Sequence, residues 1–109
     1  MNDKELLEFA ALSIGGIYDS GFISTDGGID FDQWEPLDDD GDALRLAVKL
    51  QLTICNEHVS AGAVYCTNGD EDYPMVLSGK DESDVIDSDF SATRRAIIIA
   101  AAEIGRAIK

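Results

Sequence analysis

Residues 34–50, WEPLDDDGDALRLAVKL, decide the fold of this chain because they mark the start of a helix clearly. Pro36 has no amide hydrogen and stops a helix from running through it, and the acids that follow it are strong N-cap residues. Acids at the start of a helix and bases further along it also suit the helix macrodipole. We therefore predict a helix over residues 40–50. Its buried face is expected to hold Leu44, Ala47, Val48 and either Leu50 or Gln51, with Arg45 and Lys49 on its outer side.

Two further helices are predicted at the ends of the chain. Apolar residues at helical spacing follow Asn2 or Asp3, either of which can cap a helix over residues 3–14. The last stretch, FSATRRAIIIAAAEIGRAIK (90–109), predicts the longest helix, over residues 91–107, capped by Asp89 or Ser91. A glycine inside such a helix weakens it, so Gly105 is expected to mark a close backbone approach.

Branched and aromatic residues predict strands between these helices. Residues 52–67 predict a hairpin, and a turn centred on residues 60–61 would place Cys55 opposite Cys66. Apolar residues fall on both sides of these strands, which favours a sheet covered on both faces. Shorter strands are expected at 17–24, broken at residues 20–21, at 29–31, and at an edge near 73–77, while Trp34 anchors the core. The predicted fold is a single α+β domain over residues 1–109, a helix/sheet/helix sandwich with three helices and a small, mainly antiparallel sheet of three to four strands.

Length and hydropathy limit what the chain can be. Its 109 residues suit one core rather than two, and 45% hydrophobic residues argue against global disorder. No apolar run approaches the roughly 20 residues that span a bilayer. The first residues, MNDKELLEF, lack the basic-then-apolar pattern of a signal peptide, so we expect a cytoplasmic protein.

The negative charge is concentrated in two segments. The chain has 22 acids against 8 bases, a net charge of -14. Residues 26–42 hold eight acids and no base, and residues 70–89 hold eight acids and one base, which predicts acidic loops at 26–39 and 68–89. This charge opposes direct binding to nucleic acid or to an anionic membrane surface. It fits either a solvated surface that aids solubility or a surface for a basic protein partner. The candidate partner-binding residues are Asp38, Asp39, Asp40, Asp42, Asp70, Glu71, Asp72, Asp81, Glu82 and Asp84.

The residues that carry reaction chemistry form no recognisable catalytic or metal motif. Cys55 and Cys66 lack CxxC spacing, and reduced, buried thiols are the expected state in the cytoplasm. A dyad of either cysteine with His58, the one histidine, would lack an orienting group. A calcium loop starting at Asp38 would need glycine at residue 43 and glutamate at residue 49. We predict no catalytic residue, no cofactor and no metal site, and a protein that is not an enzyme.

Two motifs together resemble those of small, largely uncharacterised proteins of tailed bacteriophages and prophages, of the phage ABA-sandwich or NinX-like kind. The matching residues are Trp34, Pro36, the 39–45 segment and the 92–96 segment, about a third of the chain. Glu35 stands where the family pattern has asparagine. The resemblance implies an α+β sandwich, a phage origin and a bacterial host cell, and it implies no activity.

The leading functional prediction is a non-enzymatic accessory protein that binds a host or phage protein through its acidic surface. DNA-mimicking inhibitors of host defence or nucleic-acid-binding proteins act in this way, through charge that complements a basic partner. Two alternatives stay open. One is a binder of a small ligand or divalent metal, or an enzyme, that uses carboxylates, and the other is a structural homo-oligomer. The sequence leaves the oligomeric state undetermined.

Overall fold

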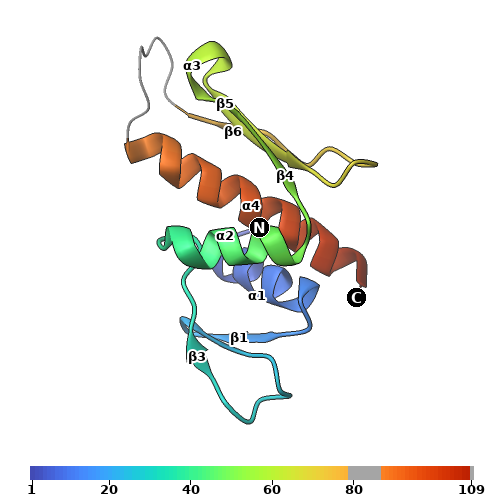
Figure 1. Ribbon diagram of the computed structural model, residues 1–109. Helices are drawn as coiled ribbons and strands as arrows, with labels where there is room; N and C mark the ends of the chain where they lie inside the picture. Colours follow the sequence, from blue (N-terminus) through green and yellow to red (C-terminus); the bar gives the residue numbers. More distant parts are fainter. Residues whose placement is uncertain (79–86, 109) are drawn as a thin grey trace.

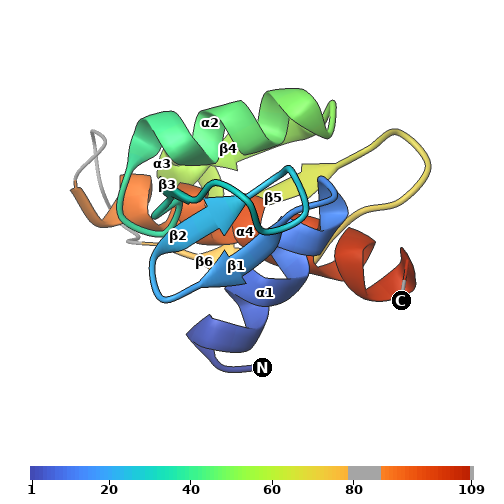
Figure 2. The same ribbon diagram turned by 90° about the horizontal axis from the view of Figure 1, so that it is seen from below.

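The computed structural model describes residues 1–78 and 87–108, without the side chains of residues 59 and 60. Three helices of ten or more residues, α1 (Asp3–Ser13), α2 (Asp40–Lys49) and α4 (Asp87–Ile108), lie between two antiparallel sheets (Figures 1 and 2). One sheet contains β1 (Ile17–Asp19), β2 (Phe22–Ser24) and β3 (Asp32–Gln33), and the other contains β4 (Thr53–Glu57), β5 (Ala63–Thr67) and β6 (Val76–Leu77). The predicted α+β class is confirmed. The strands form two sheets of three rather than one sheet, and the helices lie between the sheets.

Helix α4 is the centre of the molecule. One side of it packs on the β4–β6 sheet and the other side packs on α1 and α2. The contact with α1 is so close that a Cβ atom added to Gly105 would lie 1.8 Å from the carbonyl oxygen of Phe9. The expected close approach at Gly105 is therefore confirmed, and small residues permit it along both helices: Ala10, Ala11, Ala100, Ala101 and Ala102 are all fully buried.

The predicted start is right for the first of the two terminal helices, α1, and wrong for the second, α4. Asn2 caps α1 through a capping box, in which it accepts from the Glu5 amide at 2.8 Å and Glu5 accepts from the Asn2 amide. Helix α4 begins at Asp87, so the caps predicted at Asp89 and Ser91 are wrong. The helix continues through both positions. The acids in its first turn stabilise it, because the N-terminal end of a helix carries a partial positive charge.

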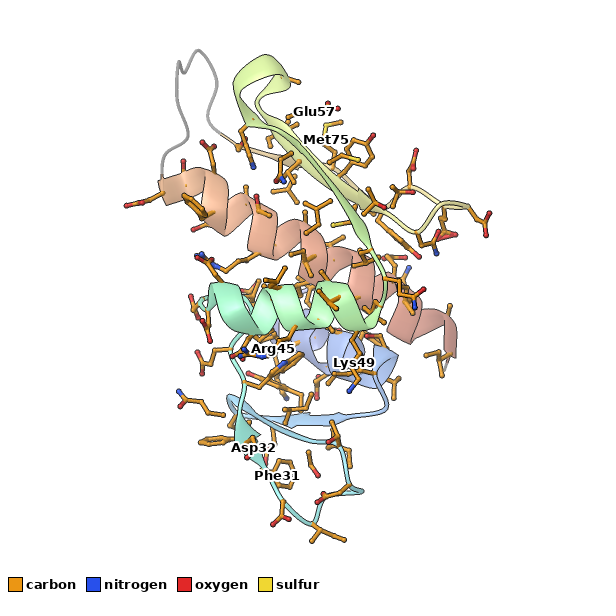
Figure 3. The ribbon with its side chains drawn as sticks, viewed as in Figure 1. Phe31, Asp32, Arg45, Lys49, Glu57 and Met75 are labelled. Carbon is orange, nitrogen blue, oxygen red and sulfur yellow. The ribbon has the colours of Figure 1, made fainter. Side chains whose placement is uncertain are left out.

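Helix α2 begins where predicted but buries a different face. Ala43 and Leu46 are buried, and so is Ala47, as predicted, but Leu44 and Val48 are 57% and 68% exposed, so the predicted apolar stripe is wrong at these two positions. The reason is Asp42, whose carboxylate accepts from the backbone amide of Glu35 at 2.9 Å and so turns this side of the helix inward. Arg45 and Lys49 are exposed, as predicted, on the side of α2 toward the β1–β3 sheet, where Figure 3 labels them.

The hairpin of β4 and β5 is confirmed, but its register differs by one residue from the prediction. The connection contains the single helical turn α3 (His58–Ala61) and ends at Gly62, which has the left-handed φ of 63°. This five-residue connection pairs Cys55 with Tyr65 and Ile54 with Cys66. The two cysteines therefore lie on opposite faces of the sheet as free thiols, and the register that would have joined them is wrong.

Strand β6 confirms the edge strand predicted near residues 73–77, since Val76 pairs with Val64 at the side of β5 away from β4. Side chains of Val64 and Cys66 are fully buried on the face that α4 covers. The other face exposes Met75 and Leu77. The sheet was predicted to be covered on both faces. Helix α4 covers one face, and the other face is open at Met75 and Leu77.

The β1–β3 sheet packs on α1 through its first strand. Ser20 and Gly21 join β1 to β2 with positive φ angles of 48° and 91°, as expected for a break at these residues. The third strand lies at residues 32–33, so the extended piece expected at 29–31 is displaced. Trp34 is buried and contacts Tyr18 edge to face, with ring centroids 6.0 Å apart, which confirms its predicted role as an anchor.

Candidate functional site

The predicted acidic residues at the start of α2 mostly have structural partners. Asp39 is the N-cap and accepts from the Gly41 amide at 3.2 Å. Asp40 accepts from Arg94 of α4 at 2.6 Å, and the same guanidinium donates to the Leu37 carbonyl at 2.8 Å. These contacts join α2 to α4. They leave few of these carboxylates for a partner.

Asp42 is the most embedded of this group. Burial raises the pKa of its carboxyl, but the hydrogen bond from the Glu35 amide and the Arg45 guanidinium at 2.5 Å outweigh this and lower the pKa below its ordinary value. The carboxylate therefore stays charged and holds the turn after Trp34 against α2. The side chains of the other three candidates in this segment accept hydrogen bonds within the fold. Among the described side-chain hydrogen bonds, none involves Asp38, which is exposed.

The second predicted group lies at the other end of the molecule. Asp70, Glu71 and Asp72 are exposed in the connection between β5 and β6, where Asn68 accepts from the amides of Asp70 and Glu71. Figures 1 and 2 both place this connection on the opposite side of the molecule from the N-terminus of α2. The structure does not bring the two groups together. The remaining candidates, Asp81, Glu82 and Asp84, lie outside the described residues.

A different surface combines carboxylates with exposed apolar side chains. Strand alternation puts Tyr18 and Ile23 on the inner side of the β1–β3 sheet, and Ile17 and Phe22 on its outer side, where they are about half exposed. Phe22 pairs with Gln33 of β3, and Phe31, two residues before Gln33, is also exposed. Ile29 in the β2–β3 connection is 80% exposed. We call Ile17, Phe22, Ile29 and Phe31, with the acids beside them, the β1–β3 outer face.

The connection that carries Ile29 has a defined shape. One carboxylate oxygen of Asp26 accepts from the amides of Ile29 and Asp30, both at 3.0 Å, and from the Ser24 hydroxyl at 2.7 Å. The hydrogen bond from the Asp30 amide, followed by that from Ser24, lowers the pKa of Asp26 below its ordinary value. Gly28 has a φ of 94° and donates to the Ser24 hydroxyl at 2.9 Å. Ile29 is thus presented from an ordered turn, not from a random chain segment.

The charge around this face has one sign. No lysine or arginine occurs between Lys4 and Arg45, whereas Asp19, Asp26 and Asp30 belong to the strands and connection of the face. The bases nearest in the fold, Arg45 and Lys49, line the inner side of the sheet together with Asp32. Figure 3 shows the same arrangement, with Phe31 at the end of the molecule away from the helices. Sequence reasoning missed this face. A usable signal for it is the run without lysine or arginine between Lys4 and Arg45, because large apolar residues fall in turn-rich segments of this run.

A second site surrounds the one histidine. His58 and Asp89 are 6% and 1% exposed, and His58 Nδ1 lies 3.5 Å from Asp89 Oδ1. His58 also contacts the hydroxyls of Ser78, at 2.7 Å from Nδ1, and Thr93, at 2.9 Å from Nε2. These residues come from three segments, the β4–β5 connection, the end of β6 and α4. They adjoin a cavity of about 400 Å³ that Asn56, His58, Asp89, Phe90 and Thr93 line.

The described residues offer no metal centre or membrane span. Among residues 1–78 and 87–108, no group of three or more His, Cys, Asp or Glu side chains is arranged to hold a metal ion. In the same part of the chain, no helix has the length and apolar character that crossing a bilayer requires. Comparison with protein-family models, with curated proteins and with solved structures gives no match to this chain.

Proposed function

We propose that this chain is a phage- or prophage-encoded accessory protein that binds a basic protein of the host or phage through its β1–β3 outer face. The observation that carries the proposal is the exposure of Ile17, Phe22, Ile29 and Phe31 in a stretch of chain with several acids and no base. Protein interfaces typically have an apolar centre and a polar rim. A partner with an apolar patch surrounded by lysine and arginine would complement this face.

The energetic roles of the two kinds of residue differ. The aromatic rings of Phe22 and Phe31 would supply most of the affinity when a partner covers them, because buried aromatic side chains dominate interface energetics. Carboxylates of Asp19 and Asp30 would raise the association rate and select basic partners, and their effect would weaken in salt.

The proposal uses one acidic region rather than two. A DNA-mimicking inhibitor needs negative charge along one continuous surface, and the β5–β6 connection, which holds Asp70, Glu71 and Asp72, lies on the opposite side of the molecule from the start of α2. We therefore prefer a compact protein–protein contact on the β1–β3 outer face to a mimic that uses both acidic groups.

The test is retention of a partner from a bacterial lysate at low salt, with matched pairs of variants. The Phe22→Ser, Phe31→Ser double variant removes the rings of the face. Met75→Ser, Leu77→Ser removes two apolar residues of the other sheet that are even more exposed, at 58% and 77%, and serves as its control. Asp19→Asn, Asp30→Asn is compared in the same way with Asp70→Asn, Asp72→Asn.

We expect the native protein to retain a protein with a basic surface, and the Phe22, Phe31 variant to retain at least tenfold less of it, while the Met75, Leu77 variant retains the native amount. High salt and the Asp19, Asp30 variant should each reduce retention. The proposal is wrong if no protein is retained, if all variants retain equal amounts, or if the retained protein is this chain itself, which would favour the homo-oligomer.

A further inference from the structure

His58 combines three features that together suggest more than a structural role. It is the one histidine of the chain, it is buried, and it lies against a buried carboxylate on the wall of a cavity. Burying ionisable groups costs free energy unless they are hydrogen-bonded or paired, so such groups are concentrated at functional sites. This cavity lies between β4, α3 and α4, and its lining shares no residue with the β1–β3 outer face.

The hydrogen bonds determine what His58 can offer to a ligand. The single hydroxyl hydrogen of Thr93 points to oxygen atoms, the Asp89 carbonyl at 2.8 Å and the Asn56 side chain at 3.3 Å. With that hydrogen used, the Thr93 hydroxyl oxygen faces Nε2 of His58 as an acceptor, and Nδ1 faces both the Ser78 hydroxyl at 2.7 Å and the Asp89 carboxylate at 3.5 Å. Both ring nitrogens are used within the protein. The ring of His58 is a rigid wall of the cavity, and the Asn56 amide is the polar group left to recognise a ligand.

The lining also defines the charge and shape of the ligand. The cavity is mostly apolar, and its size of about 400 Å³ is within the range of small-molecule sites. An anion would meet the buried carboxylate of Asp89, and a cation would meet the positive end of α4, on which Asp89, Phe90 and Thr93 all lie. An uncharged ligand avoids both costs. The half-exposed ring of Phe90 provides a flat apolar surface at the cavity.

We propose that this cavity is a binding site for a small, uncharged aromatic amide. Its ring packs on Phe90, and its carboxamide pairs with the side-chain amide of Asn56, which has both a donor and an acceptor. His58, which contacts Ser78 and Thr93, forms part of the cavity wall. The site is independent of the protein-binding face proposed above.

The test uses the imidazole of His58 as a reporter, because a chain with one histidine gives one set of imidazole NMR signals. The probes are benzamide, benzoate and benzylamine, which share a ring and differ in charge. We expect benzamide to shift the His58 signals in a saturable way, with a Kd of about 1 mM for so small a probe. Benzoate and benzylamine should bind at least tenfold more weakly.

Two phenylalanines provide a matched pair of variants. Phe90→Ala should weaken benzamide binding at least tenfold, and Phe22→Ala, which removes an equally exposed ring from the other end of the fold, should leave it unchanged. The proposal is overturned if benzamide does not shift the His58 signals up to its solubility limit, if the three probes bind equally, or if Phe90→Ala binds benzamide as the native chain does. The comparison of the three probes needs no variant, so it stays informative whatever Phe90→Ala does to folding.

Discussion

The two sheets have three strands each but differ in what covers them. The β4–β6 sheet rests on α4, which buries Val64 and Cys66 completely, and the segments at its end enclose His58. The β1–β3 sheet buries Ile23 and partly buries Tyr18, which contacts Trp34, and it leaves Phe22 and Phe31 about half exposed to solvent. The first sheet thus contributes to stability and encloses a cavity, whereas the second presents an apolar surface among acids. Sheets with the same number of strands therefore need not have the same role, because the role depends on which elements cover each sheet.

The largest expected effect is at the helix contact between the sheets. Gly105→Ala would place a methyl group at 1.8 Å from the Phe9 carbonyl, so α1 and α4 must separate. We expect a loss of about 3 kcal/mol in the free energy of unfolding, as for an overpacked core, measured by urea denaturation. The control is Gly41→Ala, whose methyl group would meet the flexible end of Arg45 at 3.3 Å and the Asp39 carboxylate at an ordinary 3.6 Å, and which should change stability by less than about 0.5 kcal/mol. Equal effects at the two glycines would contradict the close packing of α1 on α4.

A pair of substitutions compares the two sheets directly. Val64→Ala leaves a cavity under the β4–β6 sheet and should cost about 2 kcal/mol. Phe22→Ser removes a larger side chain from the β1–β3 outer face and should cost less than about 0.5 kcal/mol, because solvent already reaches that ring. Urea denaturation of both variants provides the measurement. A larger loss for Phe22→Ser than for Val64→Ala would show that the outer face is part of the core.

The carboxylate of Asp42 predicts a pH-dependent contribution. Its pKa in the folded chain lies below the ordinary value of 3.8, so the charged form stabilises the fold above about pH 4. That stability is lost as the pH falls through the folded pKa. Asp42→Asn should therefore cost about 1.5 kcal/mol at pH 7, and this cost should fall as the pH is lowered progressively below 3.8, as measured from unfolding over a series of pH values. Asp38→Asn, in the same segment but exposed, should show no such pH-dependent difference, and the account of Asp42 fails if the two variants behave alike.

The smallest expected effect is a difference in thiol reactivity between Cys55 and Cys66, which tests the register of β4 and β5. Burial, followed by the nearby Cys55, raises the pKa of Cys66 to about 11, so iodoacetamide at pH 8 should modify Cys55 and spare Cys66 in the folded chain. Mass spectrometry of the labelled protein gives the ratio. Formation of an intramolecular disulfide under mild oxidation would contradict a register that separates the two thiols to opposite faces.

Local sequence signals predicted most helices and strands of the fold. The features that they mispredicted, the buried face of α2 and the hairpin register, depend on contacts outside the local sequence. Pro36 and the acids after it gave the start of α2, and Gly105 gave the helix contact, because each acts through its own backbone. The buried face of α2 was wrong at Leu44 and Val48, because Asp42 lies on the buried side, where it accepts from the Glu35 amide seven residues away. The hairpin register was wrong because a helical turn at residues 58–61 replaced a tight turn.

The same distinction holds for the candidate sites. Charge counting found the acids, but it did not show that Asp39, Asp40 and Asp42 are used within the fold, since their partners include Arg94, more than 50 residues away. The β1–β3 outer face depends on which side of a short sheet faces α1, and short strands carry little periodicity to decide this. The site around His58 joins residues 58, 78, 89 and 93, which no local pattern connects.

The most direct test of the central claim, that the β1–β3 outer face binds the partner, is photo-crosslinking from single positions. A photoreactive phenylalanine analogue is placed at Phe22 in one protein and at Leu77, on the exposed face of the other sheet, in a second, and each is irradiated in a bacterial lysate. We predict a covalent adduct with one basic protein from position 22, diminished by high salt, and no such adduct from position 77. An adduct with the same protein from position 77 and none from position 22 would contradict the claim and assign the contact to the β4–β6 sheet.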